Sequence, residues 1–159
     1  MNRFSILNEN ALDWTVVIHN QEQWMKLPPF ISELRVDDHG CNELSFTELD
    51  FSSFTNLKKI DVGGNSLLHV NRLLMNGLNK LTEVNIGEGS LNNTRELTIG
   101  SNSLNHGDLQ SINLKPFTNL RTLSIGSNSL LSTQHILTST MNDLQSFSVG
   151  SSSMINLIK

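Results

Sequence analysis

The stretch Leu57-Lys-Lys-Ile60-Asp-Val62-Gly-Gly-Asn65-Ser-Leu67 decides the fold, because its pattern of apolar residues with an Asn near the end recurs along the chain. The stretch Leu120-Arg-Thr-Leu123-Ser-Ile125-Gly-Ser-Asn128-Ser-Leu130 matches it at every patterned position. Six copies begin at residues 31, 57, 81, 94, 120 and 144. Tandem repeats of this size predict a solenoid, in which each copy buries its apolar face against its neighbours.

The other four copies keep the apolar frame with substitutions. His39, Gly89 and Ser152 stand in the Asn place, and the copy with Asn102 begins with the polar Thr94. The apolar-x-apolar centre of each copy has the period of a strand with one face buried. We therefore expect parallel front strands near residues 34–36, 60–62, 84–86, 123–125 and 147–149.

These spacings resemble the consensus of the leucine-rich repeat. The resemblance implies a solenoid with a concave face of parallel strands and a role as a protein-interaction scaffold. It also implies that Asn65, Asn102 and Asn128 lie inside the turns and hydrogen-bond backbone groups of adjoining coils. A glycine follows the strand in five copies, where a turning backbone benefits from its conformational freedom. These glycines are Gly63, Gly87, Gly100, Gly126 and Gly150.

A second apolar pattern precedes four of the copies, at eight, six and three positions before the first residue of the copy. Its members are Leu49, Phe51 and Phe54; Leu73, Met75 and Leu78; Ile112, Leu114 and Phe117; and Ile136, Thr138 and Met141. The spacing of two and the residue types favour short strands on the convex side. Residues 73–78 and 136–141 also fit one helical turn. The predicted fold class is a mainly β, leucine-rich-repeat-like solenoid with convex-side strands or turns.

The copies fall into two equivalent sets of three. Those that begin at 31, 57 and 81 superimpose on those that begin at 94, 120 and 144 after a single shift along the sequence. This pattern predicts a duplicated block, with residues 31–93 followed by residues 94–156. The interval between 81 and 94 is about half of every other interval, and a coil in this family needs about 20 residues or more. The short interval therefore predicts an irregular seam, in which the segment 94–104 forms a loop or hairpin, or the solenoid bends or breaks. The apolar pattern instead favours a front strand at residues 97–99, for which the short interval leaves no ordinary place.

Residues 1–30 fit a divergent first coil or N-terminal cap in which Trp14 and Trp24 cover the core. Residues 31–159 form the predicted solenoid. No polar cap follows the last copy, so we expect the solenoid to continue beyond Lys159 or to end uncapped. An uncapped coil predicts self-association.

Composition indicates one soluble domain of 159 residues with 37% hydrophobic residues. The net charge of −4 and the absence of a basic stripe argue against nucleic acid and membrane as partners. Neither a signal peptide nor a transmembrane run is recognisable. We therefore expect a cytoplasmic protein, although a fragment of a longer surface or secreted protein would look the same. The single cysteine, Cys41, occupies an apolar position and is expected to be buried.

No catalytic pattern stands out. The five histidines are scattered, and the His39-Gly40-Cys41 pair lacks a second pair to complete a metal site. Gly-x-Ser-x-Gly and phosphate-loop motifs are absent. We expect no enzyme, no cofactor and no metal.

The predicted binding surface is the concave face, where residues between the apolar strand positions point outward. The candidates are Glu33, Arg35, Lys59, Asp61, Glu83, Asn85, Thr122 and Ser124. Mixed charges in this set favour a specific protein partner. The alternative is a structural segment or fragment of a longer repeat array with no binding function of its own.

Overall fold

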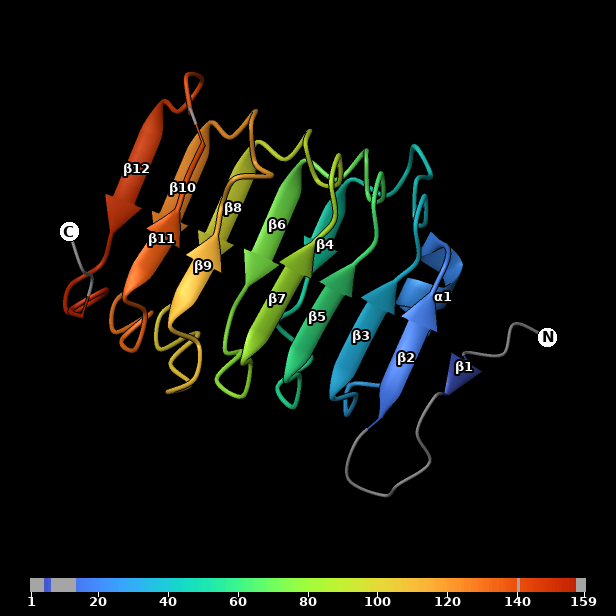
Figure 1. Cartoon of the computed structure of the whole chain (residues 1–159), viewed down its shortest axis with the longest axis horizontal. Coiled ribbons are helices and arrows are strands. Elements are labelled where there is room, and N and C mark those ends of the chain that lie inside the picture. Colours follow the sequence, from blue (N-terminus) through green and yellow to red (C-terminus); the bar gives the residue numbers. More distant parts are fainter. Residues whose placement is uncertain (1–4, 7–13, 140, 157–159) are drawn as a thin grey trace.

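The computed structural model describes residues 5–6, 14–139 and 141–156. Its parallel strands coil into a β-solenoid of about five turns with little helix. Figure 1 shows two layers of strands, one in front of the other, with the strands of each layer side by side along the long axis. The predicted fold, a mainly β solenoid with parallel strands, is confirmed.

The front layer holds two sheets. The larger contains β1 (Ser5–Ile6), β2 (Thr15–Ile18), β3 (Glu33–Val36), β5 (Lys59–Val62) and β7 (Glu83–Ile86), in that order. All its neighbours run parallel except β1, which pairs antiparallel with β2. The smaller sheet pairs β9 (Ser111–Asn113) with β11 (His135–Leu137) in parallel, further along the same layer (Figure 1).

The back layer is one parallel sheet. It contains β4 (Glu48–Asp50), β6 (Arg72–Met75), β8 (Glu96–Ile99), β10 (Thr122–Ile125) and β12 (Ser146–Val149). The second apolar pattern therefore forms strands β4, β6, β9 and β11. The alternative of helical turns is wrong for the described residues of 73–78 and 136–141, because both ranges begin within strands and contain no helix there.

The seam is a half-turn of the solenoid. The chain passes from Glu83, where β7 begins in the front layer, to Glu96, where β8 begins in the back layer beside β6. From β3 to β12 a full coil separates registered positions by 24 or 26, as in the hydrogen bonds from Ser66 to Ser90 and from Gly40 to Ser66. The first coil, from Thr15 of β2 to Glu33 of β3, is shorter, with a separation of 18. The seam has about half the length of the later coils, which suffices for one crossing between the layers. The expectation of a loop or hairpin at 94–104 is wrong, because residues 96–99 form a regular strand.

The half-turn exchanges the two faces. Repeat strands of the first block, β3, β5 and β7, lie in front, whereas those of the second block, β8, β10 and β12, lie at the back. The predicted break of the solenoid at the seam is found only in the front layer, in which β7 and β9 are not paired. Figure 1 shows a wider interval between β7 and β9 than between their neighbours, with β6 and β8 of the back layer behind this part of the front layer. The back layer continues through β8 without a break.

The core lies between the two layers. Inward residues of most strands are buried, such as Leu34, Ile60 and Leu97. The last strand differs: Phe147 is 58% exposed and Val149 is 39% exposed. Their predicted burial is wrong, because no coil within the described residues covers β12.

Aromatic residues close the other end of the core. Helix α1 (Gln21–Met25) begins after Asn20, whose side chain accepts a hydrogen bond from the Gln23 amide at 3.0 Å. The ring of Trp24, on this helix, lies 5.3 Å from those of Phe51 and Phe54 in edge-on contacts. These contacts pack the helix against the first coils.

The turn asparagines do not lie inside the coils. Asn65, Asn102 and Asn128 are exposed, and their φ angles are 51°, 54° and 54°. His39 and Ser152 share this left-handed conformation, which Asn adopts more readily than most residues. The prediction that these asparagine side chains lie inside the coils is therefore wrong. What the residues at the Asn place share is a backbone with a positive φ angle.

The serine directly after the Asn place is the buried residue that hydrogen-bonds backbone groups of adjoining coils. Ser129 is fully buried, donates its hydroxyl to Gly100 O at 2.6 Å and accepts a hydrogen bond from Ser103 N at 3.2 Å. Ser66 and Ser90 form the same link between front coils at 2.8 Å. Each hydroxyl satisfies backbone groups that burial would otherwise leave unpaired.

Glycine after the strand permits close stacking of coils. A Cβ on Gly126 would lie 2.3 Å from Ser101 N, and one on Gly87 would lie 2.6 Å from Gly63 C. Neither residue has a positive φ. The predicted explanation for these glycines, conformational freedom, is therefore wrong. Glycine occurs after the strand because the neighbouring coil leaves no space for a side chain.

Candidate interaction surface

The outer face of β3, β5 and β7 carries six of the eight predicted binding residues in two rows. Parallel register places Glu33, Lys59 and Glu83 in one row and Arg35, Asp61 and Asn85 in the other. We call these six residues the front charged face. Opposite charges alternate across neighbouring strands, an arrangement that stabilises a sheet by modest amounts per pair.

Hydrogen bonds and an ion pair order one side of this face. Lys59 Nζ lies 3.2 Å from Glu83 Oε1, and the Asn85 side chain donates to the same oxygen at 2.6 Å. The hydrogen bond to Glu83 raises the pKa of Lys59. The pKa of Glu83 is lowered, first by the hydrogen bond from Asn85 and then by that from Lys59. Both groups are charged at neutral pH and open to solvent.

A shallow pocket opens beside these residues. It has a volume of about 200 Å³ and is lined by Thr15, Glu33, Leu34, Arg35, Lys59 and Asp61. Thr15 donates a hydrogen bond to Glu33 Oε2 at 3.1 Å, which orients that carboxylate. The pocket offers charges of both signs, and so suits a polar or zwitterionic group of a partner.

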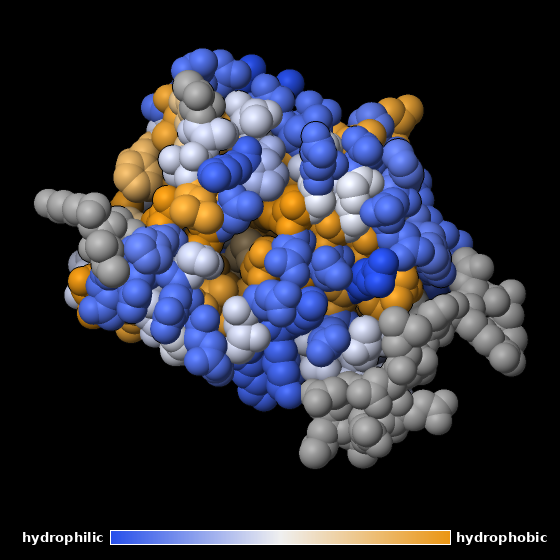
Figure 2. All heavy atoms as spheres, in the orientation of Figure 1, coloured by the Kyte–Doolittle hydropathy of each residue, from blue (hydrophilic) through white to orange (hydrophobic). Residues whose placement is uncertain are grey.

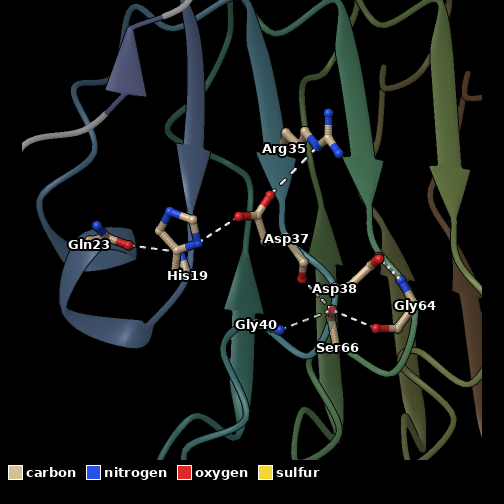
Figure 3. Close-up of polar contacts among 8 residues, drawn as sticks. All are labelled: His19, Gln23, Arg35, Asp37, Asp38, Gly40, Gly64 and Ser66. Carbon is tan, nitrogen blue, oxygen red and sulfur yellow. Dashed lines mark hydrogen bonds and ion pairs between the residues drawn. The ribbon is translucent and has the colours of Figure 1, made fainter.

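A network at the ends of β2 and β3 extends the face (Figure 3). His19 Nδ1 lies 2.7 Å from Asp37 Oδ2, and Arg35 Nε lies 3.7 Å from Asp37 Oδ1. Gln23 of α1 accepts a hydrogen bond from the His19 amide at 2.7 Å. Sequence reasoning missed His19, which belongs to no repeat copy, and Asp37, which stands where the other five copies have glycine after the strand.

Thr122 and Ser124 do not join the front charged face. They lie on β10 in the back layer, where Ser124 accepts a hydrogen bond from Ser148 at 3.0 Å. The prediction of one shared face is wrong because the seam moves the second block to the opposite layer.

The back layer has a charged row of its own. Arg72 lies 3.1 Å from Glu48 and 3.5 Å from Glu96, on adjacent strands. Sequence reasoning missed these residues, although they alternate with apolar residues as the front ones do. On β10 and β12 the outward residues are neutral hydroxyls.

Cys41 is a buried free cysteine. Burial, with a smaller effect of the Glu43 charge, raises the pKa of its thiol to about 12. The thiolate is the reactive form, so this thiol is inert near neutral pH. Among residues 5–6, 14–139 and 141–156, no group of three or more His, Cys, Asp or Glu residues could hold a metal ion.

Comparisons with protein-family models, curated proteins and solved structures found no match to the chain. In the described part of the chain, no helix is both long enough and apolar enough to cross a membrane.

Proposed function

We propose that this chain is a non-enzymatic protein-interaction module of the leucine-rich-repeat kind, and that it binds its partner through the front charged face. The observation that carries the proposal is the register of β3, β5 and β7, which gathers six polar residues from three coils onto one surface. Repeat solenoids commonly present such continuous surfaces to partners.

The charges of this face suit recognition of a polar protein surface. Arg35 and Lys59 stand beside Glu33 and Asp61 at the shallow pocket. Mixed charges contribute specificity and association rate more than affinity. The partner proposed is therefore a protein with a complementary arrangement of both signs, bound more weakly as salt rises.

The experiment is affinity capture from the source organism with matched charge reversals on the two layers. The front variant is Arg35→Glu with Lys59→Glu, and the back control is Arg72→Glu. We expect the parent chain and the back control to retain the same protein, and the front variant to lose it. Capture that the front variant retains, or capture that the back control loses equally, would refute this surface as the binding site.

The second candidate function is a structural segment within a longer array of repeats, whether cytoplasmic or part of a surface protein. The exposed Phe147 and Val149 on β12 favour it, because another coil or chain would bury them. Two results together would support this second function. Further coils would cover β12 in a longer protein, and the capture experiment would find no partner for the front charged face.

A further inference from the structure

Two strand edges face each other across the front layer at the seam. The Gly87 amide donates to Val62 O of the preceding coil at 2.7 Å. Because successive amides of a strand point to opposite sides, the Val84 and Ile86 amides point away from β5 and toward β9. Within the described residues, no strand pairs with this edge of β7.

The facing edge of β9 is complementary. The Leu114 amide donates to Leu137 O at 2.7 Å, on the side of β11. By the same alternation, the Ser111 and Asn113 amides point toward β7. Two rows of backbone donors and acceptors therefore border the interval, which is the environment that a β-strand satisfies.

The floor of this interval is apolar. Figure 2 shows a hollow lined by hydrophobic atoms on the face where β7 and β9 lie in Figure 1. It has a volume of about 40 Å³. Val84, Ile86 and Ile112 line it in the front layer, and Leu97 and Ile99 of β8 line it in the back layer. It also reaches core residues of the earlier coils, such as Ile60 and Leu73. The space exceeds that of one water molecule, yet among the described residues that line it Asn113 is the one polar member, so an apolar group fits it better than water.

We propose that this gap, the seam slot, binds an extended segment of a partner protein as an added strand, with small apolar residues such as Val or Ala at alternate positions. The two edges require an extended backbone, because a helix satisfies its own backbone groups internally. The apolar floor requires apolar side chains at every second position, and the small volume limits their size. The site lies between β7 and β9, beside the two members of the front charged face that β7 carries, Glu83 and Asn85.

The test uses the fluorescently labelled, end-blocked peptide Lys-Thr-Val-Ser-Val-Thr-Lys, measured by fluorescence anisotropy. The control peptide, Lys-Val-Val-Ser-Thr-Thr-Lys, has the same composition without the alternation. Asn113→Pro removes an amide that faces the slot and leaves the bonds of Ile112 and Leu114 to β11. Ile86→Phe fills the hollow from the opposite edge. Circular dichroism and thermal unfolding identify which variants remain folded.

We expect saturable binding of the alternating peptide, with affinity at least about tenfold weaker for the control peptide and for each folded variant. Hydrogen exchange should slow at the Val84 and Ile86 amides when peptide is added. Arg72→Glu, which changes an outward residue of β6 in the back layer, should leave peptide binding unchanged.

Equal binding of both peptides, or binding that survives Asn113→Pro and Ile86→Phe, would overturn the proposal. Peptide protection confined to the amides of β12 would place the site at the end of the solenoid and would overturn it equally. A dimer of the unliganded chain that Asn113→Pro abolishes would make a second copy the occupant, and would exclude the partner segment.

Discussion

At the scale of residues, small side chains in the turns hold the coils together. The buried serines supply hydrogen bonds, and the glycines after the strands let neighbouring backbones touch. The Asn place holds Asn, His, Ser or Gly with a positive φ, and an apolar residue such as Leu67 has a positive φ two positions later. The repeat pattern located the Asn place and the glycines, but it did not single out the serine between the Asn place and the final apolar residue. Asn and Ser are both polar turn residues, and only the local φ angles decide which side chain points inward.

Removal of a buried hydroxyl tests this division of roles. Ser129→Ala leaves the amide of Ser103 and the carbonyl of Gly100 without their partner, and we expect a loss of about 1–3 kcal/mol in the free energy of unfolding. The control is Ser146→Ala, at an exposed position on β12. Chemical denaturation measures both variants, and equal midpoints for the two would contradict the assignment.

A pair of glycines tests the close stacking of coils. Gly126→Ala places a methyl group 2.3 Å from backbone of the preceding coil, whereas nothing lies within 4 Å of a Cβ at Gly107. We expect the first substitution to cost about 3 kcal/mol or more, because the backbone cannot yield as a side chain can. Gly107→Ala should leave stability unchanged or slightly raised. Thermal unfolding that shows no difference between the two would refute the steric explanation.

At the scale of elements, apolar residues at every second position correctly indicated strands on both sides of the solenoid. This alternation located β4 and β6 as well as the front strands. The layer in which each strand lies could not be predicted in the same way. The spacing between repeats shows how many residues the chain uses to pass from one layer to the other, but it does not show in which layer a given repeat begins. The short interval at the seam is one crossing, so every repeat of the second block lies opposite its counterpart in the first. This explains why Thr122 and Ser124 were assigned to the wrong face.

Hydrogen exchange distinguishes the continuous layer from the interrupted one. Strand β8 pairs on both sides, so we expect slow exchange along Glu96–Ile99. The Val84 and Ile86 amides, at the unpaired edge of β7, should exchange faster than those of β8. Fast exchange throughout residues 92–107 would instead indicate the irregular seam that the spacing alone suggests.

At the scale of the whole molecule, the two ends of the described solenoid differ. Trp24 and α1 cover the first coils, whereas β12 exposes Phe147, Val149 and an edge that no described strand pairs with. No charged residue or Pro occurs in Ser146–Val149 to discourage pairing of strands. The covered first end favours pairing of two copies end to end through β12 over an open filament.

This asymmetry predicts dimerisation that depends on concentration. Phe147→Lys should shift the sedimentation profile toward monomer, because it replaces an exposed apolar side chain with a charge at the interface. The control Lys115→Ala changes a residue outside β12 and should leave the profile unchanged. A parent chain that sediments as monomer at every concentration would contradict the prediction.

The half-turn at the seam is the central claim, and disulfide formation tests it most directly. Leu74 and Thr98 are registered partners on β6 and β8 of the back layer, at the separation that a disulfide between adjacent strands requires. Cys41 does not compete, because its thiol is buried. We predict that mild oxidation cross-links Leu74→Cys with Thr98→Cys and fails to cross-link Asn85→Cys with Thr98→Cys. The opposite result, efficient cross-linking of positions 85 and 98 alone, would place β8 beside β7 in the front layer and contradict the account.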